Sequence, residues 1–346
     1  MKALVFHDPG DIRYDGVPEP TIQAPDGAVL RVTAASICGS DLHLFHGRMP
    51  VERGLIVGHE FVGVVEAVGP AVRSVRPGDR VIAPGVIGCG TCTPCRTGHV
   101  TACTTYAMQV YGITPALQGG QAEQVYVPHA DVNLVPIPHG LDDEDVLFLT
   151  DILPTGHQGA ERGGVAPGDV VAVIGAGPIG LTSLLSSQLM GAAHVIAVDP
   201  DPGRRDAATR FGAIAVTPDD APARVLELTG GRGADVVIEA VGREETLTAA
   251  VTLVRVGGRV SVVGVFIEPA MPFPIGMAFM KDVTLRIGLA DVPKHLPPLL
   301  ALVQSGRLKP RELITHRMGL RDGTEAYRLF DQRRDGCLKI VLDPRA

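Results

Sequence analysis

The chain has 346 residues, 45% of them apolar and 20% charged, so it can form two domains with sizeable cores and does not have the composition of a disordered protein. Its formal net charge is −7, from 31 basic and 38 acidic side chains, and no basic run marks a surface for nucleic acid. No apolar stretch reaches the ~18 residues of a membrane span, and the N-terminus lacks the apolar core of a secretion signal. We therefore expect neither a membrane nor a nucleic-acid partner.

The first 150 residues are typical of short strands and loops, with weak helical periodicity. The strand-like segments are rich in β-formers and bounded by Gly, Pro or Asp; they are residues 2–7, 28–34, 61–68 and 80–83. This pattern predicts an irregular, mostly β first domain.

Four cysteines cluster in a lobe at residues 88–104: Cys89, Cys92, Cys95 and Cys103. The spacing C-x2-C-x2-C-x7-C lets one loop surround a tetrahedral ion, and four thiolates fill every position of a structural zinc. In a long chain without a signal peptide, such clustering indicates metal binding before disulfides, and thus a reducing compartment, the cytoplasm. A zinc ribbon for nucleic acid is the alternative, but Arg96 is the lobe's single cation.

The pattern changes after Pro154 to strands that alternate with helices. Apolar segments covered on both faces are expected at residues 170–175, 194–199, 236–239, 259–265 and 284–288, and this alternation predicts a parallel, doubly wound sheet. From residue 291 the chain is mixed again, and the strand-like residues 337–342 are expected to rejoin the first domain. The expected domains are 1–153 with 291–346, and 154–290.

The segment from Gly175 to Gly180, Gly-Ala-Gly-Pro-Ile-Gly, follows an expected strand and opens an expected helix. In a dinucleotide-binding turn, Gly175 permits the tight bend, Gly177 lets the backbone approach the pyrophosphate, and Gly180 allows the helix to pack on the strand. Pro178 and Ile179 then begin the helix, whose N-terminus favours phosphate. The alternative is a glycine-rich turn of another α/β protein.

Asp199 ends the next strand, about twenty residues further on, where an acid accepts hydrogen bonds from the adenosine ribose. Its charge would repel a 2′-phosphate, which favours NAD over NADP. Arg204 and Arg205 are close in sequence and weaken that argument, because arginines near the ribose can accommodate a 2′-phosphate. Their alternative explanation is a solvated helix face.

A second metal site is indicated by Cys38 and His59, which stand apart from the cysteine lobe. Alone, each has an ordinary explanation, as a core thiol and a loop histidine. Asp151 lies in an apolar stretch at the domain junction, where a charge is costly unless it is paired or metal-bound. A catalytic zinc needs about three protein ligands and one open position. These three residues can supply the ligands and leave the fourth position open.

Together these motifs resemble zinc-dependent alcohol dehydrogenases of the medium-chain dehydrogenase/reductase superfamily, including threonine, polyol and formaldehyde dehydrogenases. The resemblance covers nearly the whole chain and implies a GroES-like β domain, a Rossmann domain, two zinc ions and a homodimer or homotetramer paired through the Rossmann domain. It further implies a catalytic zinc on Cys38, His59 and Asp151, with Glu60 able to exchange onto the metal. Ser40 and His43 match a proton relay, and Arg204 a contact near the adenosine ribose. The segments expected to line the nicotinamide are Val263, Gly264, Val265, Gly288 and Leu289.

The function that follows is hydride transfer between a primary, secondary or polyol alcohol and NAD(P). Ser40 and His43 also have ordinary explanations, as a turn hydroxyl and a surface histidine. Two alternatives for the whole chain are a zinc-free quinone or enoyl reductase, and a non-catalytic nucleotide-binding homologue. The zinc ligands argue against both.

Overall fold

The computed structural model describes all 346 residues, which form two compact units. The first unit is Met1–Pro154 together with Asp291–Ala346, and the second is Thr155–Ala290. Helix α5 (Ile152–Arg162) begins in the first unit and continues into the second. None of the helices combines the length and the apolar character that a membrane span requires.

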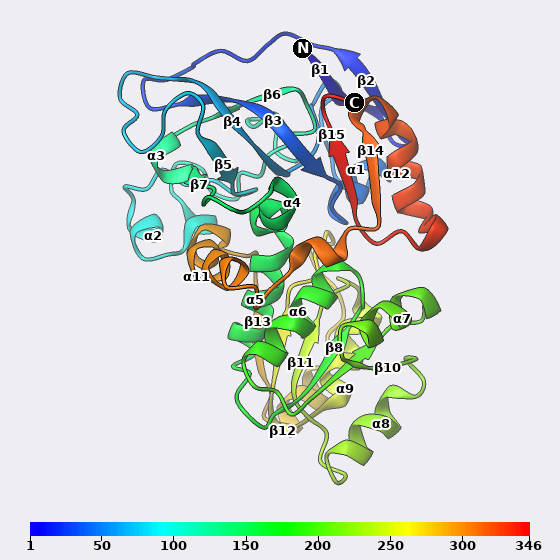
Figure 1. Cartoon of the computed structure of the whole chain (residues 1–346). Coiled ribbons are helices and arrows are strands. Elements are labelled where there is room, and N and C mark those ends of the chain that lie inside the picture. Colours follow the sequence, from blue (N-terminus) through cyan, green and yellow to red (C-terminus); the bar gives the residue numbers. More distant parts are fainter. The chain divides into compact units, whose positions relative to one another are not determined.

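The first unit is built on a seven-stranded sheet in the order β14-β15-β3-β4-β5-β7, with β6 also paired to β3, beside a two-stranded β1-β2 hairpin (Figure 1). Its strands are β1 (Lys2–Asp8), β2 (Asp11–Gly16), β3 (Ala28–Ser36), β4 (Glu60–Val68), β5 (Arg80–Ala83), β6 (Gln124–Val127), β7 (Val135–Pro136), β14 (His316–Gly319) and β15 (Ile340–Asp343). Its helices and 3-10 turns are short, apart from α11 and α12: α1 (Asp41–Phe45), α2 (Thr93–Arg96), η1 (Val100–Ala102), α3 (Ala130–Asn133), α4 (Asp143–Val146), η2 (Leu147–Thr150), α11 (Val292–Gln304), η3 (Pro310–Leu313), η4 (Leu320–Asp322), α12 (Gly323–Gln332) and η5 (Arg334–Gly336).

The C-terminal strand belongs to the sheet of the first unit. β15 pairs antiparallel with β3, with Val341 opposite Ser36 and Leu342 opposite Ala35. Helix α12 packs its apolar side, including Tyr327, into the core that this sheet covers. Because β3 and β4 are antiparallel neighbours, the end of β3 lies beside the start of β4, which places Cys38 close to His59.

The second unit is a six-stranded, wholly parallel sheet in the order β10-β9-β8-β11-β12-β13. Its strands are β8 (Val170–Ile174), β9 (His194–Val198), β10 (Ile214–Val216), β11 (Ala234–Glu239), β12 (Val254–Val262) and β13 (Thr284–Ile287), and its helices are α6 (Pro178–Leu189), α7 (Pro202–Arg210), α8 (Ala221–Leu228), α9 (Glu244–Leu253) and α10 (Ile275–Met280). The chain runs outward from β8 in both directions, so the point where strand order reverses lies between β8 and β11. The predicted fold class is confirmed.

Two strands differ from the prediction by three or more residues at a boundary. β12 begins at Val254, before the Gly257-Gly258 pair that hides the strand pattern, and it ends at Val262 rather than at residue 265. Val263 and Gly264 leave the strand ladder because their N–H groups both donate to the carbonyl of Glu239. In the tail, β15 begins at Ile340 rather than at residue 337, since the residues just before it turn toward the Thr315 hydroxyl.

Candidate active site

Cys38, His59 and Asp151 come together as one cluster in the first unit, with all their ligand atoms within 4.8 Å of one another. The Cys38 Sγ lies 3.3 Å from the Asp151 Oδ2, which lies 3.4 Å from the His59 Nε2. Cys38 and His59 are buried at the ends of β3 and β4, and Asp151 follows η2 at the start of α5. Three distant segments therefore supply one sulfur, one nitrogen and one carboxylate.

The electrostatics of this cluster are those of a site for a cation. Burial, together with the nearby charges of Asp151 and Glu60, raises the pKa of the Cys38 thiol to about 11. Burial opposes the charged form of His59, but the carboxylates of Asp41 and Asp151 outweigh it and hold the imidazole pKa well above its usual range. A divalent cation would satisfy all these groups at once.

The donor set fits zinc. Zinc takes thiolate, imidazole and carboxylate ligands, and a catalytic zinc has three of them, leaving one position for substrate. The Nδ1 of His59 and the Oδ1 of Asp41 are both buried and lie 3.1 Å apart, and neither atom has another partner. With Nδ1 facing a carboxylate, Nε2 is the nitrogen left to face the ion, which is how a metal-bound histidine is usually held.

Asp41 is a site residue that the sequence analysis missed. Its Oδ2 accepts the backbone N–H of Cys38 at 2.9 Å, while its Oδ1 faces His59, so one buried carboxylate orients two of the three donors. The sequence does contain a signal: an acid three residues after Cys38, at the first position of a helix.

Ser40 precedes the short helix α1 as its N-cap residue, and His43 lies within that helix. The Ser40 hydroxyl is 3.2 Å from the Cys38 sulfur and 3.1 Å from the His59 Nε2, so it touches the donor cluster. His43 is half-buried in the last turn of α1, three residues after Ser40 and thus on the same side of the helix.

Glu60 lies next to the cluster but belongs to a different pair. Its Oε2 pairs with the ammonium group of Lys339, and both side chains are completely buried. Lys339 also donates to the carbonyl of Ile37 at 2.7 Å and lies over the Phe148 ring. Burial raises the pKa of Glu60, although Lys339 opposes that effect. Lys339 is a second residue that the sequence analysis missed, because it is almost 280 residues away from Glu60.

The four cysteines of the lobe form the second cluster, again with ligand atoms within 4.8 Å. Backbone N–H groups point at the sulfurs: that of Tyr106 lies 3.3 Å from the Cys103 Sγ, and that of Cys92 lies 3.5 Å from the Cys89 Sγ. A hydrogen bond from the Thr91 hydroxyl, with backbone N–H groups, lowers the pKa of Cys89 to about 5. Such thiolate-stabilising contacts fit a tetrahedral zinc.

The backbone of the lobe is held closed at Gly88. A Cβ there would lie 2.9 Å from the Cys95 sulfur and 2.8 Å from Val100, so no larger residue fits. The buried side chain of Asn133 accepts from the Gly88 N–H and donates to the Gly88 carbonyl, each at 3.0 Å. Asn133 thus anchors the lobe to α3.

The glycine turn of the second unit has the geometry of a phosphate-binding loop. Gly175 has φ +92°, which only glycine adopts freely. A Cβ on Gly180 would lie 1.8 Å from the Gly175 carbonyl, so the helix packs on the turn only with glycine there. Gly177 caps α6, whose first residues are Pro178 and Ile179, and a Cβ on Gly177 would lie 3.6 Å from the Arg204 guanidinium.

Asp199 lies just after β9 with its carboxylate buried. It accepts the N–H of Ala176 at 2.8 Å and that of Asp201 at 2.9 Å, so it ties the glycine turn to the end of β9. Arg204 lies 3.8 Å from this carboxylate. Arg205 instead donates to the backbone carbonyls of Asp199, at 2.9 Å, and Pro200.

The segments expected to line the nicotinamide follow β12 and β13. Val263 and Gly264 donate to the Glu239 carbonyl, at 2.9 Å and 3.1 Å, and Val265 follows directly. A Cβ on Gly264 would lie 2.3 Å from the backbone nitrogen of Gly242. After β13 come Gly288 and Leu289, and the Leu289 carbonyl accepts from the Gln158 side chain at 2.9 Å.

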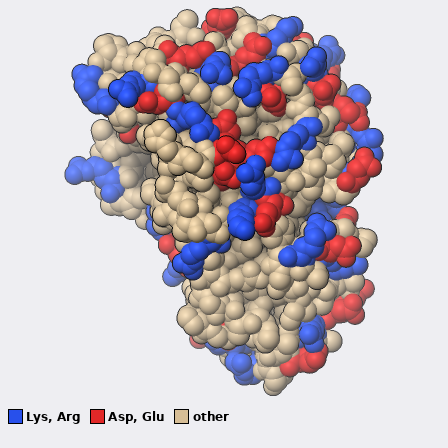
Figure 2. Space-filling view, viewed as in Figure 1, with Lys and Arg blue, Asp and Glu red and all other residues tan.

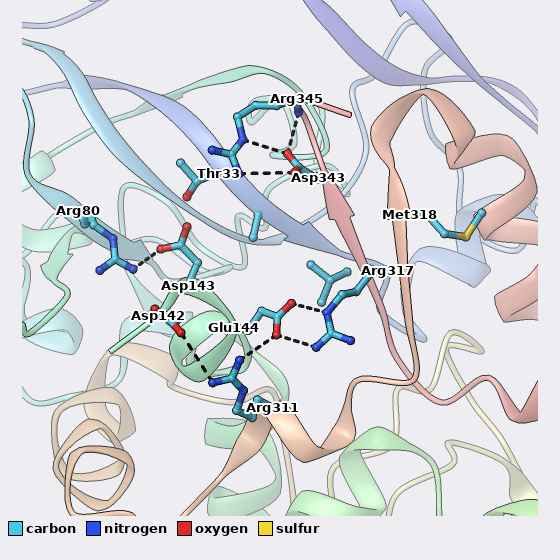
Figure 3. Close-up of a pocket in the computed structure, with 12 residues that line it drawn as sticks. Thr33, Arg80, Asp142, Asp143, Glu144, Arg311, Arg317, Met318, Asp343 and Arg345 are labelled. Atoms are coloured by element: carbon cyan, nitrogen blue, oxygen red, sulfur yellow. Dashed lines mark hydrogen bonds and ion pairs between the residues drawn. The ribbon is translucent and has the colours of Figure 1, made fainter. Parts of the chain in front are cut away.

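A hollow of about 460 Å³ lies elsewhere in the first unit, among α4, η3, β14 and β15 (Figure 3). Glu144 accepts from Arg317 through both oxygens, at 2.6 Å and 2.7 Å, and from Arg311 at 3.3 Å. Arg80 pairs with Asp143, and Arg345 pairs with Asp343. Each guanidinium here already has a carboxylate partner, so we assign the cluster to stability. On the face shown in Figure 2, positive and negative side chains are interspersed and form no continuous basic surface.

Family models match both parts of the chain. Residues 24–139 match the alcohol dehydrogenase GroES-like domain, and residues 178–305 match the zinc-binding dehydrogenase domain. A probable zinc-binding alcohol dehydrogenase of Mycobacterium tuberculosis is 40% identical over 99% of this chain and 89% of its own length. The structure of an alcohol dehydrogenase from Thermus sp. ATN1 is 43% identical, covers 99% of both chains and superposes with a TM-score of 0.94.

Solved relatives hold both forms of the cofactor. A zinc-binding dehydrogenase of Sinorhizobium meliloti (30% identity, TM-score 0.85, covering 99% of both chains) is bound to NADP, and an alcohol dehydrogenase of Escherichia coli (29%, 0.88, 99% of both) is complexed with NADH. The clustered zinc ligands also set aside the zinc-free reductase alternative. With both domain models, full-length relatives and two zinc-type donor clusters in agreement, this chain belongs to the zinc-binding medium-chain alcohol dehydrogenase family, and it is a zinc-dependent alcohol dehydrogenase.

Proposed function

We propose that the chain interconverts alcohols and their carbonyl products with NAD as the preferred cofactor, on a catalytic zinc held by Cys38, His59 and Asp151. The observation that carries this proposal is the convergence of their three ligand atoms within 4.8 Å, with the Ser40 hydroxyl touching two of the residues. Zinc, when bound, supplies a Lewis acid that lowers the pKa of the substrate hydroxyl. The four-cysteine lobe holds a second zinc that leaves no position for substrate.

The chain's own groups move the proton. The Ser40 hydroxyl lies where it can accept the proton of the substrate hydroxyl and donate its own onward. His43, half-buried one turn along α1, then passes the proton to solvent. Glu60 is paired with Lys339 and is the neighbouring acid that would exchange onto the metal.

The cofactor preference rests on the end of β9. A 2′-phosphate on the adenosine ribose would meet the buried carboxylate of Asp199, and Arg205 is held away by two backbone carbonyls. Arg204, near Gly177 and Asp199, fits a contact to the ribose side of the dinucleotide.

The test is steady-state kinetics with primary and secondary alcohols, polyols and their carbonyls, each with NAD(H) and NADP(H), on protein whose zinc content has been measured. The proposal expects two zinc ions per chain and a higher kcat/KM with NAD. Asp199→Ala should lower the NAD-to-NADP ratio of kcat/KM about ten-fold, equivalent to about 1.4 kcal/mol. The ratio is the informative number, because the variant also frees the Ala176 N–H and so weakens both cofactors. An unchanged ratio would count against Asp199 as the discriminating group.

We also propose that two copies pair through the second unit. β13 is the edge strand of its sheet, and apolar side chains are exposed on it and on the preceding helix: Ile275 (70%), Phe279 (80%), Met280 (76%) and Ile287 (59%). A second copy related by a two-fold axis would satisfy the open strand edge and cover this apolar surface. Sedimentation should show that Ile287→Lys dissociates the oligomer while Leu226→Lys, at an exposed position on α8, does not.

The four zinc-binding thiolates are best preserved in a reducing compartment, so we place the protein in the cytoplasm.

A further inference from the structure

Behind His59 a line of buried polar groups leads away from the metal cluster to the C-terminal helix. The Tyr327 hydroxyl donates to the Gln121 Oε1 at 2.8 Å, and the Gln121 Nε2 lies 3.4 Å from the Asp41 Oδ2. Asp41 in turn faces His59 across 3.1 Å. All four side chains are at most 3% exposed.

We propose that Gln121 and Tyr327 are positioning residues for the catalytic zinc, acting through Asp41 on the His59 imidazole. This inference rests on the proposed role of His59 as a zinc ligand. It concerns residues that do not touch metal, substrate or cofactor.

The first step of the argument is the cost of the Asp41 charge. A buried carboxylate is tolerated only when donors surround it. Its donors are the Cys38 N–H at 2.9 Å and the Gln121 amide, and its remaining oxygen is turned toward His59. Without the Gln121 amide donor, the Asp41 carboxylate would lose one of the hydrogen bonds that hold it in this orientation.

The second step is the orientation of the amide itself. A carboxamide can face Asp41 with its NH2 group or with its oxygen, and only the first arrangement is attractive. The Ser36 carbonyl, which can only accept, selects this arrangement, because the Gln121 Nε2 also donates to it at 3.0 Å. The Tyr327 hydroxyl then donates to the Gln121 oxygen and holds the amide in this orientation from its other end.

The third step is rigidity. The backbone of Gln121 is fixed on both sides, because its N–H donates to Val57 and its carbonyl accepts from Leu4. Its side chain packs so closely on Gly58, the residue before His59, that a Cβ at Gly58 would lie 2.3 Å from it. Gln121 thus contacts both the backbone just before His59 and the Asp41 carboxylate, which faces the His59 ring.

The experiment compares Tyr327→Phe and Gln121→Glu with Tyr111→Phe in the full chain. Tyr111 is a matched control, because it is equally buried in the same core and its hydroxyl has no hydrogen-bond partner. The readouts are the dissociation constant of the catalytic zinc, from chelator competition, and the melting temperature of the metal-free protein. Total zinc per chain counts the ions of both sites together, and chelator competition resolves the two by their affinities.

We expect Tyr327→Phe to weaken the catalytic zinc about ten-fold and Gln121→Glu about a hundred-fold, the range measured when outer-shell partners of metal ligands are changed. The lobe's zinc should be unaffected, and Tyr111→Phe should stay within about two-fold of wild type. If Tyr327→Phe changes zinc affinity no more than Tyr111→Phe does, or only lowers the metal-free melting temperature, the inference is overturned. A wild-type chain that binds only the lobe's zinc would overturn the proposed site as well. If Gln121→Glu does not fold, the Tyr327 comparison decides.

Discussion

Lys339 holds the one ammonium group that is completely buried beside the catalytic cluster, and replacing it should be among the most damaging single changes in the first unit. Lys339→Met keeps most of the side-chain volume but removes the partner of Glu60 and the donor to the Ile37 carbonyl. Breaking a buried ion pair from one side costs about 3–5 kcal/mol, because the other charge stays buried without compensation.

The loss has an upper limit, since Glu60 can take up a proton. Burial already raises the pKa of this carboxyl, and Lys339 is the group that opposes the rise. We therefore expect about 3 kcal/mol rather than 5, and Glu60→Gln/Lys339→Met should recover part of it because no buried charge remains. For a unit of this size, 3 kcal/mol corresponds to a melting temperature lower by about 6–12 °C.

The measurement is calorimetry or circular dichroism at pH 7 on metal-free protein, because the chain has no tryptophan for fluorescence. Lys309→Met, at an exposed lysine of the same unit, controls for the loss of a positive charge. A melting-temperature shift of less than about 2 °C for Lys339→Met would refute the argument that each of these buried charges depends on the other for its compensation.

Three further predictions follow from the site and its surroundings. Cys38→Ser should nearly abolish turnover yet leave NAD binding, measured by calorimetric titration, unchanged, and a wild-type rate would end the catalytic assignment. Cys92→Ala should remove one zinc per chain and lower the melting temperature, so full loss of activity with unaltered melting would contradict a structural lobe. Glu144→Gln should cost about 1 kcal/mol at pH 7, a modest value because Arg317 is 58% exposed. Because hydrogen bonding to Arg317 lowers the pKa of Glu144 from 4.5, the pair's stabilisation is complete above 4.5 and is lost as the pH falls through the lowered value. A difference between wild type and variant that does not shrink on acidification below pH 4.5 would disprove this.

The features that could be predicted from the sequence are those whose residues lie close together along the chain. The glycine turn and the four-cysteine lobe each occupy one short segment, so their chemistry is visible without knowledge of the fold. Cys38, His59 and Asp151 are distant from one another, and they were grouped through the family resemblance and the cost of a buried charge. The cluster that they form in the structure agrees with that grouping.

What could not be predicted depends on contacts between distant segments. Lys339 is an ordinary lysine in the sequence, and only the pairing of β15 with β3 brings it to Glu60. Gln121 and Tyr327 likewise meet across about two hundred residues. The start of β12 is hidden in the sequence for a different reason. Gly257 and Gly258 interrupt its apolar pattern, although the strand continues through them.

The insertion of β15 beside β3 also sets an order of events during synthesis. The Ser36 hydroxyl donates to the Ile340 carbonyl across 304 residues, so this part of the β3 edge stays unpaired until β15 has been synthesised. The nucleotide unit, in contrast, is one uninterrupted segment that can fold while translation continues. A nascent chain that stalls shortly before Ile340 would therefore carry a finished nucleotide unit beside an open sheet edge, the kind of surface that chaperones bind and that aggregation exploits.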